Sequence, residues 1–283
     1  MYRHIEEKVS QMTGAKIIRF KNKIGFYYIL FALLMLALYL YFAVIEIPFL
    51  YWLAILTIPI SFIIFLPVLS SIDEGYKKIL SEHLDIDRYQ DIIEGFSFYK
   101  SGRLGSRNRA EKSFYYLNMA HLQFLRGNFL ASLEALSEIQ PTDFRVKKQE
   151  NIVFYYYLEA LDKIFLGQTD NLSSILEHMS SQEFKSEKEK KKAQQRIETV
   201  QSLDKIVTKH EACNHFEYLE SDNKLDKVLM TYYAGLNCLN QGKNDQVLDL
   251  FSSITDENPD LFTVKEAKKY IEEKSSNLSK EVE

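Results

Sequence analysis

The 283-residue chain has little cysteine, glycine or proline. Two cysteines, Cys213 and Cys238, are too few for the disulfide framework of a secreted scaffold, and they fit a reducing compartment. Ten glycines and five prolines leave few positions that break helices. No long stretch alternates apolar and polar residues as strands do. These absences predict an all-α protein with long helices.

An excess of positive charge is also missing from most of the chain. The formal net charge is −4, and residues 73–283 carry 29 Lys/Arg against 36 Asp/Glu. Residues 1–23 are the exception, with six Lys/Arg against two Glu. The large acidic part lacks the basic face that neutralises phosphates, so no nucleic-acid partner is expected.

Two long runs near the N-terminus contain no charged residue, at 24–45 and 47–72. Twenty-two helical residues rise about 33 Å, and a bilayer's hydrocarbon core is about 30 Å thick. The sequence therefore predicts a transmembrane helical hairpin over 24–72, with spans 24–45 and 49–72 and the lipid bilayer as partner. Pro59 and Pro67 lie inside the second span and are expected to kink it.

The charges beside these runs predict an orientation. Six Lys/Arg precede the first run, none lies between the runs, and Lys77, Lys78 and Arg88 follow the second. By the positive-inside rule both termini are cytoplasmic, and 1–23 is a basic cytoplasmic segment. A cleavable signal peptide fits poorly, because the first run is too long and a second follows at once. Neither run holds an ionisable residue, which favours a plain anchor over an ion pathway.

After two expected juxtamembrane helices within 73–108, at Asp73–Leu84 and Asp87–Ser101, the chain repeats a pattern. Residues 112–141, 152–179 and 228–259 each read as an apolar helix, a glycine and an amphipathic helix. The glycines are Gly127, Gly167 and Gly242, and a small residue stands seven positions earlier in each copy: Ala120, Ala160 and Gly235. A small residue permits close helix approach, and a glycine lets the chain leave a helix in the left-handed conformation.

These copies resemble tetratricopeptide (TPR) repeats. The first matches at Tyr116, Ala120, Gly127, Phe129 and Ser132, the second at Tyr156, Ala160 and Gly167, and the third at Gly235, Gly242, Phe251 and Pro259. The resemblance covers about residues 110–262, with irregular spacing. It implies an irregular TPR-like α-solenoid over 109–276, ended by a capping helix at Thr263–Lys274 and a polar tail at 277–283. Similarity to small bacterial membrane proteins with such repeats implies a bacterial plasma membrane.

The resemblance also implies a partner-binding groove. By family register its lining residues are Leu117, His121, Tyr157, Leu161, Tyr232 and Leu236. Two interpretations stay open. The groove could accept an apolar peptide or helix of a partner, or the chain's own residues 180–227 could fill it and make these residues ordinary core. We expect a long helix in that segment and a shorter one near Phe216–Leu219.

Two other groups of residues are candidate sites. The basic turn at 100–109 carries Lys100, Arg103, Arg107 and Arg109, which could contact anionic headgroups or form a plain connection. His210, Cys213 and His215 are too few for a closed zinc site, so no metal is predicted. The cations from Lys185 to Arg196 alternate with glutamates, as on a solvated helix face.

No catalytic signature is present, and we expect neither an enzyme nor a cofactor. The favoured hypothesis is a membrane-anchored cytoplasmic scaffold or adaptor that binds another protein through helical repeats. The first alternative is an accessory subunit of a membrane transport or secretion complex, and the second is an enzyme with an unrecognised site. A homo-oligomer is compatible with each.

Overall fold

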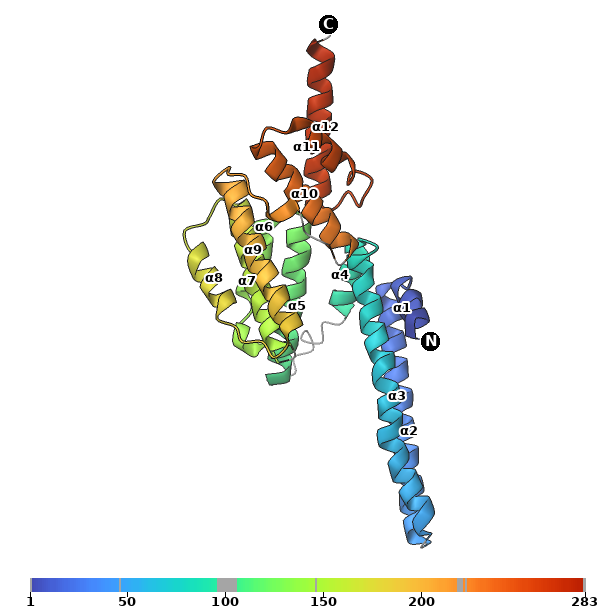
Figure 1. Ribbon diagram of the computed structural model, residues 1–283. Helices are drawn as coiled ribbons and strands as arrows, with labels where there is room; N and C mark the ends of the chain where they lie inside the picture. Colours follow the sequence, from blue (N-terminus) through green and yellow to red (C-terminus); the bar gives the residue numbers. More distant parts are fainter. Residues whose placement is uncertain are drawn as a thin grey trace. The chain divides into compact units, whose positions relative to one another are not determined.

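The computed structural model describes residues 2–45, 47–95, 106–145, 147–217, 221 and 223–281. Most of the described residues are helical, and they form twelve α-helices and no strand (Figure 1). The predicted all-α class is therefore confirmed. The chain divides into a first unit, Met1–Phe96, and a second unit, Ser97–Glu283.

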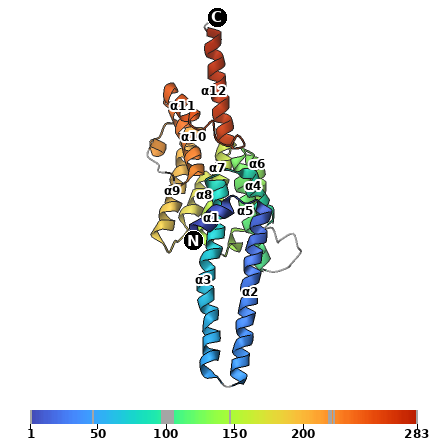
Figure 2. The ribbon, with the colours of Figure 1, turned by 90° about the vertical axis from the view of Figure 1, so that its right-hand side faces the viewer.

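The first unit is built on two long helices, α2 (Gly14–Val44) and α3 (Pro48–Ser81), which pack side by side as an apolar hairpin (Figure 2). Large apolar side chains between Phe26 and Leu66 are exposed along both helices. Gly14–Val44 and Ile55–Ser81 are long and apolar enough to cross a membrane. The coarse prediction of two such helices is thus confirmed.

Both helices extend further than the apolar runs predicted. α2 begins at Gly14, well before residue 24, and α3 continues to Ser81, which merges the second run with the helix expected at Asp73–Leu84. The change from apolar to charged residues at 72–73 alters the surroundings of the backbone but removes no hydrogen bond, so the helix does not stop there. α3 also continues through Pro59 and Pro67, and the kink expected at these prolines stays a prediction.

A small helical head closes the open end of the hairpin. α1 (Tyr2–Ser10) packs on α3, and α4 (Ile86–Gly95) packs on α2 and α3. Six aliphatic side chains are fully buried there: Val9, Ile17, Ile72, Ile79, Ile86 and Ile92. Residues 2–23, which belong to the segment predicted only as basic, are therefore a folded part of the first unit.

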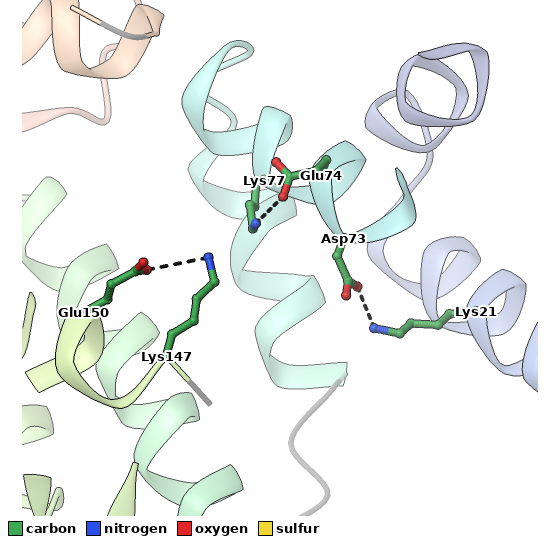
Figure 3. A network of polar contacts seen from close by, with 6 residues as sticks. All are labelled: Lys21, Asp73, Glu74, Lys77, Lys147 and Glu150. Atoms are coloured by element: carbon green, nitrogen blue, oxygen red, sulfur yellow. Dashed lines mark hydrogen bonds and ion pairs between the residues drawn. The ribbon is translucent and has the colours of Figure 1, made fainter. Parts of the chain in front are cut away.

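Ion pairs and glycines tighten this head. Lys21 pairs with Asp73 at 2.6 Å, as Figure 3 shows, and Lys78 pairs with Glu6 at 2.8 Å. A Cβ atom on Gly75 would lie 2.8 Å from the Glu6 carbonyl oxygen, so α1 and α3 approach too closely for any side chain at 75. The open end of the hairpin is thus held by contacts between segments distant in sequence.

The second unit contains three antiparallel helix pairs that match the three sequence copies. They are α5 (Ser106–Leu125) with α6 (Phe129–Ser137), α7 (Lys148–Phe165) with α8 (Leu172–Ser180), and α10 (Lys224–Asn240) with α11 (Asn244–Ser252). The linking glycines have φ of 82°, 71° and 70° at Gly127, Gly167 and Gly242. The predicted left-handed exits are confirmed.

The small residues lie where the paired helices meet. Ala120 and Ala160 are fully buried, and the Ser132 hydroxyl on α6 donates to the Ala120 carbonyl oxygen on α5 at 2.9 Å. A Cβ atom on Gly235 would overlap the Phe251 ring on α11. The seven-residue spacing therefore marks the contact line within each pair.

Residues 187–217 connect the second and third pairs, and we call them the covering segment. The segment comprises α9 (Glu187–Leu203), a π-helical turn at Asp204–Thr208 and a 3-10 turn at His215–Glu217. Where the sequence favoured a second helix near Phe216, the described residues form only that 3-10 turn. Backbone polar groups in this irregular stretch are instead paired with side chains of α10.

The last helix, α12 (Phe262–Glu281), begins among aromatic rings. The Phe262 ring lies 5.3–5.8 Å from the rings of four residues: Phe124, Phe129, Phe165 and Tyr232. In an open solenoid each repeat touches only its neighbours. Here α12 contacts the first, second and third pairs together. Its helix also continues to Glu281, into the region expected to be a polar tail.

Candidate functional site: the covered face of the second unit

The six predicted groove residues lie on α5, α7 and α10, and we call them the covered face. Leu117, Leu161 and Tyr232 are buried, with 2%, 1% and 6% of their surface exposed. His121, Tyr157 and Leu236 are half-buried. Much of this face is therefore core in the folded chain.

Arg196 of α9 lies over the middle of this face. Its guanidinium is 4.7 Å from the centre of the Phe154 ring and 5.7 Å from that of Tyr157. The His121 ring meets the Phe154 ring edge-on at 5.1 Å. Such a cation above aromatic faces contributes about 0.5–2 kcal/mol. The covering segment thus lies against the α7 part of this face.

Asparagines of α10 hold the other end of the covering segment. Asn237 donates to the Cys213 carbonyl oxygen at 2.6 Å and accepts from the Cys213 N–H at 2.8 Å. Asn240 donates to the Ile206 carbonyl oxygen at 2.8 Å. Asn237 is only 1% exposed, so its two bonds are shielded from water. The contacts favour the interpretation in which the chain fills its own groove.

The charges on this face are poorly compensated. In the part of the chain that the structure describes, the half-buried Arg196 guanidinium makes no ion pair, and burial lowers its pKa. Burial, together with the positive charge of Arg196, lowers the pKa of His121 to about 4. His121 is therefore neutral near pH 7 and offers no cation to a ligand.

A small pocket opens beside Arg196, between α7 and α9. Its polar lining consists of Glu150, Asn151, Glu189, Lys192 and Arg196, and Phe154 and Phe184 supply much of the apolar part. Glu150 is also paired with Lys147 at 3.6 Å (Figure 3). Opposite charges balance in the lining, which includes no Ser, Cys or His that could act as a nucleophile. The pocket offers a small, charged contact surface.

Asp162 is an unexpected buried carboxyl on α7. Its side chain is 0% exposed, and neither oxygen has a hydrogen-bond partner in the structure. Burial raises its pKa to about 8; the nearby Ser132 hydroxyl opposes this rise, and the Glu159 carboxylate adds to it. The neutral acid is the form that this site accommodates at pH 7.

The remaining predicted residues are only partly described. Lys100 and Arg103 lie outside the described residues, as does the side chain of Arg107. Arg109 is largely exposed and lies 3.9 Å from Asp143, too far apart for a strong ion pair. Its expected contact with headgroups stays a prediction.

Of the three residues considered for zinc, Cys213 and His215 make local structural contacts. Cys213 is bound through its backbone to Asn237, and the His215 Nε2 atom lies 3.4 Å from the Thr199 hydroxyl. Within the described ranges, no three His, Cys, Asp or Glu side chains are close enough together to hold a metal ion.

Sequence reasoning missed Arg196, Asp162 and Asn237. Arg196 lies in a run of cations typical of a solvated face, and only its following residue, Ile197, begins the apolar pattern. Asp162 and Asn237 are polar residues within apolar helices. That contrast was the only feature of the sequence that could have indicated them.

No protein family, curated protein or solved structure matches this chain. The fold by itself defines the class: an all-helical protein with two helices long and apolar enough to cross a membrane, followed by three helix pairs around an aromatic core.

Proposed function

We propose that this protein is a membrane-anchored scaffold whose second unit binds another protein in the cytoplasm of a bacterial cell. The observation that carries the anchor is the exposure of the apolar hairpin. None of the residues in the most apolar 18-residue window of α2 is buried. A core helix of a soluble protein would bury such a face, and an exposed apolar surface of this length is unfavourable in water.

The charge distribution supports the orientation. The head at the open end carries the six cations of residues 1–23, and the described residues of the connection between the helices carry none. Reporter fusions at the two termini test this orientation. A cytoplasmic reporter should be active at both ends. Activity of an exported reporter at either end would contradict it. Extraction of cell membranes with alkaline carbonate should leave the protein in the pellet, whereas its release would refute the anchor.

The architecture of the second unit supports protein binding. Stacked helix pairs present large surfaces suited to other proteins. The resemblance to TPR repeats points the same way. Because the covering segment packs on α7 and α10, the proposed contact surface is the exposed side of the helix pairs. Phe114 on α5 and Leu130 on α6 are 49% and 61% exposed there.

A second candidate, an accessory subunit of a membrane complex, is favoured by the same exposed hairpin, because partner helices could cover it as well as lipid. Photo-crosslinking residues placed one at a time in the full chain separate the two functions. Positions 114 and 130 report on the second unit, and positions 33 and 63, also exposed, report on the hairpin.

A stoichiometric protein adduct from positions 114 or 130 supports the scaffold. An adduct confined to positions 33 and 63 supports the membrane-complex subunit. Crosslinks to lipid alone, from all four positions, would remove the support for a protein partner in both proposals.

A further inference from the structure

Three cations follow one side of α2. Lys16, Arg19 and Lys23 are spaced i, i+3 and i+7, which places them on one stripe of a helix. All three are exposed, and within the described residues none forms an ion pair. Lys21, on the opposite side of α2, is bound to Asp73 at 2.6 Å. Of the four cations on α2, Lys21 thus stabilises the head, and the other three, which we call the basic stripe, face outward.

The basic stripe runs directly into the exposed apolar surface of the hairpin. The next residues on this side are Phe26, Tyr27 and Leu30, which are 63%, 55% and 53% exposed. The Lys23 ammonium lies 5.8 Å from the centre of the Tyr27 ring. From Lys23 to Tyr27 the axial rise is about 6 Å, so one side of α2 changes from cationic to apolar within about one turn. Such a change marks a boundary between water and hydrocarbon, with Tyr27 at its usual interfacial level.

The length of the basic stripe fits the headgroup layer. Lys16 and Lys23 are separated by about 10 Å along the helix. The polar layer on each side of a bilayer is about 5–8 Å thick, and long cationic side chains can reach across the difference. Ile17 is fully buried in the head, which fixes the rotation of α2 and keeps the basic stripe turned outward.

We propose that Lys16, Arg19 and Lys23 form a binding site for the phosphate groups of anionic phospholipids in the membrane that holds the hairpin. The inference rests on the membrane anchor proposed above. It adds a preference among lipids, because the three cations attract anionic headgroups more strongly than zwitterionic ones.

The test uses the full chain in nanodiscs made from equal amounts of a zwitterionic phosphatidylcholine and an anionic phosphatidylglycerol. Lipids that stay bound after mild detergent treatment are counted by native mass spectrometry. The wild type should retain anionic lipid in excess. Each cation is worth roughly fivefold near an anionic surface, so the variant Lys16→Gln/Arg19→Gln/Lys23→Gln should lower that excess at least about tenfold.

The matched control is Lys188→Gln/Lys190→Gln/Lys191→Gln, which removes the same charge from exposed positions of α9 and should keep the excess. Equal retention of both lipids by the wild type would overturn the headgroup site and leave the anchor standing. Failure of the wild type to enter nanodiscs at all would overturn the anchor itself. Inorganic phosphate that bound the lipid-free protein equally tightly through the same three residues would make the ligand a soluble anion and refute the lipid site.

Discussion

The buried carboxyl of Asp162 links the stability of the second unit to pH. Its folded pKa of about 8 lies above the usual value near 3.8, so the folded chain holds a proton that the unfolded chain releases between these values. The stabilising contribution is full below about pH 4 and is lost as the pH rises through 8. The unpartnered carboxyl therefore lowers the stability of the folded chain in alkaline solution.

Asp162→Asn removes the ionisation and keeps the size of the side chain. We expect the variant to gain stability over the wild type by about 1–4 kcal/mol between pH 5 and pH 8. Urea unfolding of the full chain in detergent micelles, followed by near-ultraviolet circular dichroism, measures the difference. Asp170→Asn, at an exposed position, is the control and should show no such trend. A constant difference across this pH range would contradict the buried ionisation.

Arg196 stabilises the covering segment through aromatic contacts and not through ion pairs. Arg196→Ala removes the cation above Phe154 and Tyr157, and we expect a loss of about 1–2 kcal/mol in unfolding free energy. Lys192→Ala, one turn earlier and exposed, should change stability by less than about 0.5 kcal/mol. The Glu150 and Asp226 carboxylates attract the guanidinium, but neither forms an ion pair with it within the described residues, so most of the loss should persist at high salt. A loss that vanished in salt would point to an ion pair instead.

Helix α12 is the element that joins all three helix pairs. Phe262 provides this contact, and it is 6% exposed among four rings. Gly127 fits beneath it, since a Cβ atom there would lie 2.8 Å from the Phe262 Cβ atom. The α5–α6 turn can therefore keep its conformation only while the start of α12 keeps its position, and the reverse also holds.

Phe262→Ala should cost about 3–5 kcal/mol, as for other buried phenylalanines. Hydrogen exchange in the full chain should rise at the α5–α6 turn as well as in α12, because both lose the same ring. Lys269→Ala, on the exposed side of α12, should leave both unchanged. Faster exchange limited to α12 would show that this helix caps only its neighbour, as in an open solenoid.

The whole molecule has two separate cores. Aliphatic residues fill the head of the first unit, and aromatic rings fill the second unit. Because each unit has its own core, damage to one core should stay in that unit. Ile17→Ala should raise hydrogen exchange in α1 and α4 and leave α7 and α10 unchanged. Faster exchange in both units would reveal a cooperative link between them.

The amino-acid sequence by itself determined the helices, the two apolar runs and the turns at Gly127, Gly167 and Gly242. Each depends on information within one or two helical turns: the spacing of apolar residues, an uncharged run, or a glycine free to adopt positive φ. The helix boundaries were predicted less well, because α2 and α3 continue past the points where polarity changes.

Only the tertiary structure decided which surfaces are covered. The covered face of α5, α7 and α10 could equally have been an open groove, because its apolar residues look alike in both cases. The Asn237–Cys213 bonds and the Arg196–Phe154 contact, which join residues far apart in the chain, bring the covering segment onto it. The head is similar, since Ile17, Ile79 and Ile92 are brought together from three helices. Local patterns record that a side chain is apolar, but long-range packing selects the surface against which it is buried.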